Sequence, residues 1–135
     1  MRAIDTNVII RFLTADDAVQ AKAARKLMED GDIFLGLTVL LEAEWVLRAG
    51  YGLSVTDIVH ALRALAGLPG VTIEDPAQLA LAFDWTGKGM DFADALHLAE
   101  AGHSAAFVTF DRKQAPKARQ SLCRYAGRGA LIPPA

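Results

Sequence analysis

Apolar residues recur along the chain with two different spacings, and polar residues or glycines separate the segments in which they do so. A spacing of three or four residues is typical of helices that bury one face, whereas short apolar runs are typical of buried strands. Val8, Ile9 and Phe12 show the helical spacing near the start, and Ile33–Leu37 is a run of the strand type. The pattern therefore predicts a chain in which helices and strands alternate.

Residues that cap helices or form turns mark where these segments should begin and end. Ser, Thr and Asp favour helix starts, and glycine favours helix ends. The predicted helices cover residues 6–13, 16 or 17 to 30, 38–47 with Thr38 as the cap, 54–66, 75 to about 85, 91–103 and about 115–121. The predicted strands cover residues 1–5, 33–37, 71–73, 106–110 and a short stretch near Leu131.

The order of these elements indicates the fold class. Strands that alternate with helices form parallel sheets whose two faces are covered by the helices. No repeat, low-complexity tract or linker divides the chain, and 135 residues are enough for one domain but short of two. We therefore expect an α/β protein: a single three-layer α/β/α domain over residues 1–135, with a central, mainly parallel sheet.

Composition indicates the cellular compartment in which the protein acts. The chain is 53% hydrophobic, yet no stretch approaches the roughly 18 apolar residues of a membrane span, and no secretory signal is recognisable at the start. Cys123 is the single cysteine, which excludes an internal disulfide and is typical of a reducing compartment. These features predict a cytoplasmic protein. The apolar surplus fits either a compact core or a surface for self-association.

The net charge of −2 hides an uneven distribution. All 16 acidic residues lie at or before Asp111, so residues 1–111 carry 16 acidic and 8 basic side chains, whereas the remainder carries six basic side chains and no acid. The basic residues nearest Asp111 are Arg112, Lys113, Lys117 and Arg119. They are candidates for binding a phosphate backbone, although a solvated helix face explains the same pattern.

Four acidic residues stand where strands should end or helices should begin, although they are far apart in the sequence: Asp5, Glu42, Asp94 and Asp111. Ligands of parallel sheets bind at the carboxyl ends of the strands, where such residues can converge. Carboxylates gathered in one place repel one another unless a cation joins them. Oxygen ligands of this kind suit Mg²⁺ or Mn²⁺, which points to a metal-dependent phosphodiesterase. Taken singly, Asp5, Asp91 and Asp111 are also good helix caps.

Four segments of the sequence carry a resemblance to a known family. They are residues 4–8 (Ile-Asp-Thr-Asn-Val), 41–47 (Leu-Glu-Ala-Glu-Trp-Val-Leu), 91–96 (Asp-Phe-Ala-Asp-Ala-Leu) and 108–111 (Val-Thr-Phe-Asp). In this order and at these separations the chain resembles the PIN-domain ribonucleases, specifically the VapC-type toxins of prokaryotic toxin–antitoxin pairs. The resemblance covers essentially the whole chain, and the full set is far more specific than a lone Asp-Thr-Asn.

The resemblance implies roles for individual residues. The acids expected to bind the metal and carry catalysis are Asp5, Glu42, Asp94 and Asp111. The expected supporting residues are Asp91, a frequent extra acid near the site, and Thr6, Asn7 and Thr109, which match polar neighbours that position carboxylates, water or phosphate. Between Glu42 and Glu44, the apolar spacing favours Glu42 as the acid that faces inward. His97, one turn from Asp94, is expected to be a partly buried packing residue.

The resemblance also implies an activity and partners. Mg²⁺ or Mn²⁺ held by the carboxylates would lower the pKa of a bound water and so provide the hydroxide that attacks an RNA phosphodiester. Proteins of this type dimerise and are neutralised by a small cognate antitoxin. We therefore expect RNA as the substrate, a homodimer, and a cognate antitoxin as a partner, with no membrane partner. The aromatic candidates for stacking on RNA bases are Tyr51, Trp85 and Tyr125.

Two other classes of function deserve comparison. A phosphatase of the Asp-x-Asp type needs an aspartate where the chain has Asn7, and no residue pair suits the phosphoacceptor and late lysine of a receiver domain. A non-catalytic RNA-binding or protein-interaction module with the same fold would be favoured by loss of one or two of the four acids, and none is lost. The nuclease is the preferred hypothesis, and the binding module is the alternative.

Overall fold

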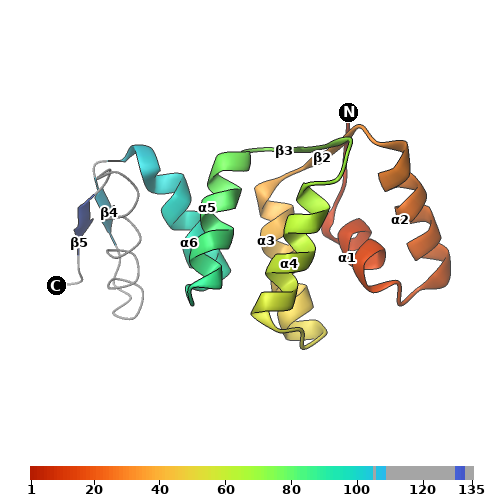
Figure 1. Cartoon of the computed structure of the whole chain (residues 1–135), viewed down its shortest axis with the longest axis horizontal. Helices are drawn as coiled ribbons and strands as arrows, with labels where there is room; N and C mark the ends of the chain where they lie inside the picture. Colours follow the sequence, from red (N-terminus) through yellow and green to blue (C-terminus); the bar gives the residue numbers. More distant parts are fainter. Residues whose placement is uncertain (105, 109–129, 133–135) are drawn as a thin grey trace. The chain divides into compact units, whose positions relative to one another are not determined.

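A computed structural model describes residues 1–104, 106–108 and 130–132 of the chain (Figure 1). The chain forms two compact units, residues 1–76 and 77–135. The first contains β1 (Arg2–Ala3), α1 (Thr6–Thr14), α2 (Ala18–Asp30), β2 (Ile33–Leu35), α3 (Leu37–Trp45), the π-helical turn η1 (Val46–Gly50), α4 (Val55–Ala66) and β3 (Val71–Ile73). The second contains α5, which begins at the boundary (Pro76–Gly87), α6 (Phe92–Glu100), the 3₁₀ turn η2 (Ala101–His103), β4 (Ala106–Val108) and β5 (Ala130–Ile132).

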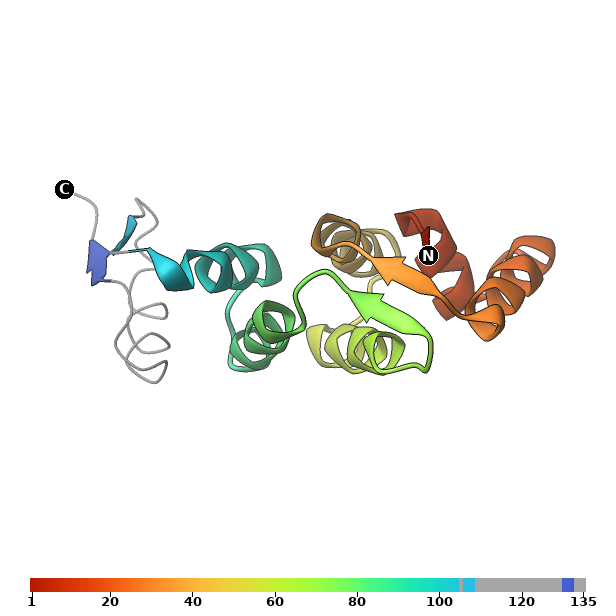
Figure 2. The ribbon, with the colours of Figure 1, turned by 90° about the horizontal axis from the view of Figure 1, so that it is seen from above.

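The three strands of the first unit form a parallel sheet in the order β1–β2–β3. Ala3 pairs with Phe34, and Phe34 pairs with Thr72. Figure 2 shows β2 and β3 side by side and pointing in the same direction. Ile33 and Leu35 on the central strand point to the same face of the sheet and are fully buried, while Phe34 on the other face is half-buried. The expected α/β class and parallel sheet are therefore confirmed.

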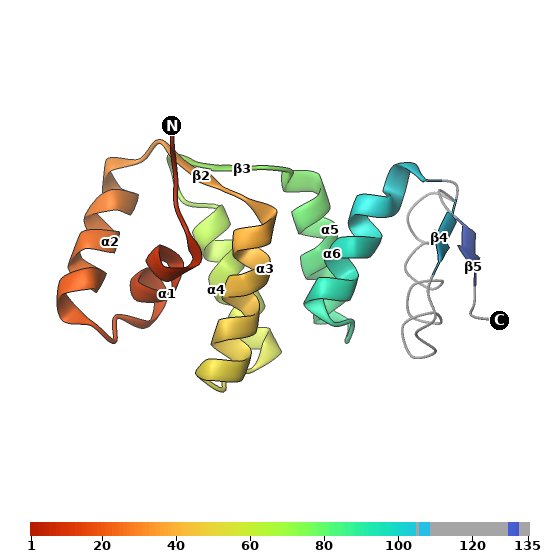
Figure 3. The same cartoon turned by 180° about the vertical axis from the view of Figure 1, so that it is seen from behind.

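The helices of the first unit pack through apolar faces. Helices α1 and α2 lie side by side, α1 also packs on α3, and α4 packs on α3 and β3 (Figure 3). Ile9 of α1, Leu40 of α3 and Ile58 of α4 are completely buried in this packing. Burying one such side chain contributes about 1.5–3 kcal/mol, so these contacts, more than intrinsic propensity, stabilise the helices.

Local sequence signals set most of the expected boundaries. Asp17 caps α2 by accepting a hydrogen bond from the Gln20 backbone N–H at 3.0 Å, and Ser54 caps α4 through the Asp57 N–H at 3.1 Å. Strand β3 and the start of α5 at Pro76 also agree with the predictions. The strands predicted over 1–5 and 33–37 are shorter than expected, and the strand predicted over 106–110 is present over its described residues 106–108. The basic helix predicted around 115–121 lies outside the described residues.

The start of α3 differs from the prediction. Thr38 is not the cap, because Gly36 occupies the N-cap position and its residue type offers no side-chain acceptor. Glu74, which directly follows β3, supplies the missing acceptor: its Oε1 accepts a hydrogen bond from the Leu37 N–H at 3.2 Å. Glu74 also donates its own backbone N–H to the carbonyl of Leu35 at 3.1 Å, which holds it beside the end of β2. A residue 37 positions away therefore caps the helix that carries Glu42.

The end of α3 is also unusual. The helix expected to stop near Leu47 widens into the π-helical turn η1. The backbone N–H of Leu53 donates to the carbonyl of Leu47 at 3.1 Å and closes this turn. Gly52 has a φ of 67°, a conformation that glycine adopts without steric cost. The chain can therefore reverse from η1 into α4 within a few residues.

The second unit contains two helices and two paired strands. Phe83 of α5 and Phe92 of α6 stack with ring centroids 5.6 Å apart. Leu79 of α5 and Leu98 of α6 are buried as well. Strands β4 and β5 pair in parallel, Phe107 opposite Leu131, as the alternating pattern predicts. The strand expected near Leu131 is thus confirmed.

Replacing Glu74 should test the cap on α3. Glu74→Ala removes the acceptor of the Leu37 N–H and should lower the free energy of unfolding by about 1 kcal/mol. Glu74→Gln keeps an acceptor oxygen in the same place and serves as the matched control, with a smaller loss. Urea denaturation of the three proteins measures the difference. Equal stability of Glu74→Ala and the wild type would show that the cap contributes nothing.

Candidate functional site

Asp5 lies directly after the β1 region and caps α1. Its backbone is extended, with φ −96° and ψ 178°, and its Oδ1 accepts a hydrogen bond from the Val8 N–H at 3.2 Å. The capping role expected for Asp5 is therefore confirmed. Within the part of the chain that the structure describes, Oδ2 has no hydrogen-bond partner, and the side chain is exposed. One carboxylate can thus cap the helix and still offer an oxygen to a cation.

The two residues after Asp5 differ in their surroundings. Thr6 is buried, with 8% of its surface exposed, whereas Asn7 is exposed at the first turn of α1. Asn7 is therefore accessible to a ligand from solvent, and Thr6 faces the interior of its unit. The supporting roles expected for both residues stay predictions.

Glu42 and Glu44 point to opposite sides of α3, and the inward one is not the one expected. Glu44 is buried, with 4% of its surface exposed, while Glu42 is exposed. The Arg48 Nε donates a hydrogen bond to Glu44 Oε1 at 2.8 Å, and this ion pair compensates the buried charge. The expectation from the apolar spacing was wrong because this spacing takes no account of Arg48, which lies one turn later and pairs with Glu44. Glu42 stays the predicted metal ligand, now as an accessible carboxylate on a helix that packs against α1.

The acids of the second unit lie at the start of α6. Asp91 is the N-cap residue, and its Oδ2 accepts a hydrogen bond from the Asp94 N–H at 3.3 Å, as predicted. Asp94 is the third residue of the helix and is half-buried on its first turn. His97 is exposed, which corrects the expectation of partial burial.

The remaining predicted site residues lie outside the described residues. They are Thr109, Asp111, Arg112, Lys113, Lys117 and Arg119. Within residues 1–104, 106–108 and 130–132, no three acidic, histidine or cysteine side chains form a group that could hold a metal ion. Carboxylate oxygens remain the right donors for Mg²⁺ or Mn²⁺. The convergence of Asp5, Glu42, Asp94 and Asp111 on one ion therefore stays a prediction.

The aromatic side chains do not follow the expected assignment. Trp85 is buried, with 5% of its surface exposed, which removes it as a stacking candidate, while Tyr125 lies beyond the described part of the chain. Trp45, which the sequence interpretation did not consider, is 59% exposed. It lies three residues after Glu42, on the same side of α3. That spacing was the signal in the sequence that could have identified it.

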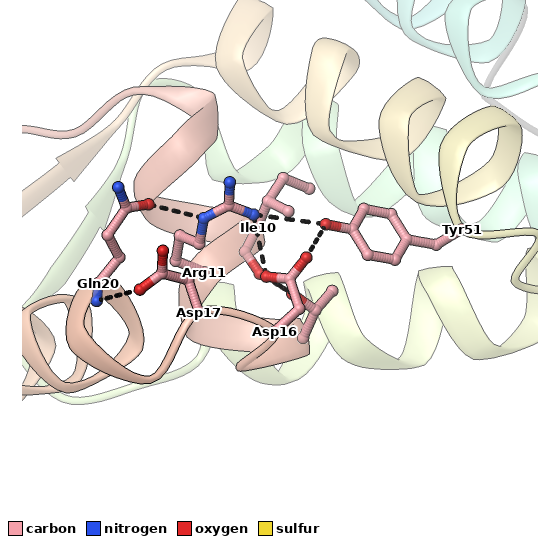
Figure 4. A network of polar contacts seen from close by, with 7 residues as sticks. Ile10, Arg11, Asp16, Asp17, Gln20 and Tyr51 are labelled. Carbon is pink, nitrogen blue, oxygen red and sulfur yellow. Dashed lines mark hydrogen bonds and ion pairs between the residues drawn. The ribbon is translucent and has the colours of Figure 1, made fainter.

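A polar network fixes the turn between α1 and α2 to the segment after η1 (Figure 4). Asp16 is its centre: it accepts hydrogen bonds from Tyr51 Oη at 2.6 Å, Arg11 Nη1 at 2.9 Å and Thr14 Oγ1 at 3.0 Å. Arg11 Nε also donates to Gln20 Oε1 at 2.7 Å. The hydrogen bond from Tyr51 is the largest cause of the lowered pKa of Asp16; Thr14 and Arg11 add to it, and desolvation opposes it. The network fixes the C-terminal end of α1, whereas Asp5 caps the N-terminal end.

Fold and acidic residues together define an α/β protein with a parallel sheet and exposed carboxylates at helix starts. The chain belongs to the PIN domain family, which matches residues 3–120. PIN domains are in general nucleases that use divalent metals and bind RNA. No curated protein matches the chain. Among the residues that the structure describes, no helix is long and apolar enough to cross a membrane.

Replacing Tyr51 should change the titration of Asp16. Because the folded pKa of Asp16 is lowered, its ionised form stabilises the fold above the unfolded pKa of about 3.9, and this stabilisation is lost as the pH falls through the folded pKa. Tyr51→Phe should raise the pKa of Asp16 toward its ordinary value, and Thr14→Val should raise it less. Carboxyl titration by NMR measures both. An unchanged pKa in Tyr51→Phe would contradict this account of the network.

Proposed function

We propose that this protein is a metal-dependent endoribonuclease that hydrolyses RNA phosphodiester bonds, and that it is the VapC-type toxin of a toxin–antitoxin pair. The observation that carries the proposal is the match to the PIN domain family over residues 3–120. This range includes all four acids of the proposed site: Asp5, Glu42, Asp94 and Asp111. The toxin role rests on the resemblance of the four sequence segments.

The proposed ligands act through carboxylate oxygens. Asp5 uses one oxygen for the cap on α1 and offers the other, while in α6 the capping role belongs to Asp91, whose Oδ2 accepts from the Asp94 N–H. Glu42 is exposed on α3, whose start is fixed by Glu74. Asp111 is proposed as the fourth ligand. Asp91, Thr6, Asn7 and Thr109 are proposed to orient these carboxylates and the phosphate.

Mg²⁺ or Mn²⁺ is the proposed cofactor. When bound, such an ion supplies positive charge that favours a deprotonated water and stabilises the charge that develops on the phosphate. The side chains would fix the position of this charge, since caps and helix packing hold the backbone of Asp5, Glu42 and Asp94. The RNA backbone would approach along Arg112, Lys113, Lys117 and Arg119.

Protein partners are part of the same proposal. A cytoplasmic homodimer, neutralised by a cognate antitoxin, fits the resemblance. Exposed apolar side chains near the end of α3 and the start of α4 support a protein-binding role for this region: Trp45, Leu53 and Val55. Such side chains are common at protein interfaces.

Cleavage of RNA by the purified protein tests the proposal. Total RNA should be cut with Mg²⁺ or Mn²⁺ and not with a chelator. Asp94→Asn should lower the rate by about 100-fold or more, because the metal ion loses a charged ligand and with it the position from which it stabilises the reacting phosphate. Glu100→Gln removes an exposed acid from the same helix and should cut normally. Cutting that persists in chelator or in Asp94→Asn would refute the proposed site. RNA binding without cutting under either metal would favour the non-catalytic module.

Two substitutions at position 5 separate capping from catalysis. Asn caps helices about as well as Asp, so Asp5→Asn should keep the stability within a few tenths of a kcal/mol while losing cleavage. Asp5→Ala loses the cap as well and should be less stable by about 1 kcal/mol. Urea denaturation and the RNA assay measure the two effects. Full cleavage by Asp5→Asn would show that the carboxylate acts only as a cap.

A further inference from the structure

The outer face of α2 forms a shallow groove that contains none of the proposed metal ligands. It has a volume of about 520 Å³, and it is lined by Val19, Lys22, Ala23, Arg25, Lys26 and Glu29. Lys22, Arg25 and Lys26 are all exposed. The groove therefore has three cationic side chains and one acidic side chain on a single helix.

The cations of this groove are poorly compensated within the protein. For Lys22 and Arg25, the structure records no ion pair or hydrogen bond with any described residue, and Lys26 has only an exposed pair with Asp30 at 3.5 Å. Lys22 is three and four residues from Arg25 and Lys26, and like charges at these separations destabilise a helix. An external anion would relieve this repulsion.

Most other cations in the acidic part of the chain have internal partners. Residues 1–111 hold only 8 basic side chains, and three of them line this groove. Arg2 donates to the carbonyl of Gly31, Arg11 pairs with Asp16, and Arg48 pairs with Glu44. Lys22 and Arg25 are thus positive charges left available on a surface that is otherwise rich in acids.

We infer that the α2 groove binds phosphate groups of the RNA backbone and is a substrate-holding surface separate from the proposed metal ligands. The inference rests on the proposed function, since it takes RNA as the polyanion. Charge complementarity carries it: a nuclease with several carboxylates must hold a polyanion against their repulsion, and cations away from those acids do so. Val19 and Ala23 line the same groove as Lys22 and Arg25, so apolar surface lies beside the charged groups that would hold phosphate.

The salt dependence of RNA binding tests this inference. The probe is a fluorescent single-stranded RNA oligonucleotide of mixed sequence, measured by anisotropy in chelator so that metal-dependent cutting is absent. Each phosphate contact contributes about 0.7 to the slope of log Kobs against log salt for single strands. Lys22→Gln with Arg25→Gln should therefore reduce the magnitude of the slope by about 1.4. Both residues are exposed, so circular dichroism should show an unchanged fold.

Two matched controls accompany this variant. Lys22→Arg with Arg25→Lys keeps both charges and should keep the slope. Arg63→Gln with Lys88→Gln removes one cation from α4 and one from the turn after α5, and gives the same net charge of −4, starting from −2. This variant should leave the slope near that of the wild type. Glu29→Gln removes the one acid of the groove and should raise the affinity.

The outcomes separate this inference from the proposed function. The inference is supported if the slope is reduced in the Lys22→Gln/Arg25→Gln variant and not in the Arg63→Gln/Lys88→Gln control. It is overturned if the two variants have equal slopes, if the slope does not change, or if the wild type does not bind RNA. If polyglutamate displaces RNA from the wild type at equal charge concentration, the inference is also overturned, and the groove would be a binding site for an acidic protein. Cleavage with Mg²⁺ or Mn²⁺ is measured separately. A protein that binds RNA as expected but never cuts it would refute the proposed nuclease activity and would leave the inference about the α2 groove standing.

Discussion

The parallel pairing of β1, β2 and β3 is the constraint on which the first unit depends. Because all three strands point the same way, their carboxyl ends meet at one edge of the sheet. Helix α1 starts after β1 with Asp5 as its cap, α3 starts after β2, and Glu74 follows β3. Glu74, directly after β3, can therefore reach the start of α3, the helix that follows β2. The same geometry sets the position of α3 and of Glu42 on it.

Helix starts explain why exposed acids recur along the chain without excessive cost. The first backbone N–H groups of a helix lack internal partners and attract negative charge. Asp5 and Asp91 each satisfy such a group with one oxygen, and Glu74 does so for α3 from a distance. A carboxylate has two oxygens, so capping and metal binding are not competing explanations. The cap fixes the side chain that a cation would use.

Some charges of the first unit have internal partners and others are left available. Glu44 is buried and has Arg48 as its partner, because an uncompensated charge costs much more inside the protein than at its surface. Asp16 is exposed, and its three donors fix the turn after α1. Lys22 and Arg25 of α2 have no recorded ion pair with a described residue, which makes the α2 groove suited to a polyanion.

The sequence by itself determined the features that depend on neighbouring residues. Helix starts at Asp5, Asp17 and Ser54, the strand over 71–73 and the cap formed by Asp91 follow from local propensity and hydrogen bonding, and the PIN family assignment follows from the motifs. Tertiary structure decided what depends on distant partners: the cap from Glu74, the π-helical end of α3, and the burial of Glu44 in place of Glu42. Periodicity identifies a buried face, but only three-dimensional packing decides which charge is placed there with a partner.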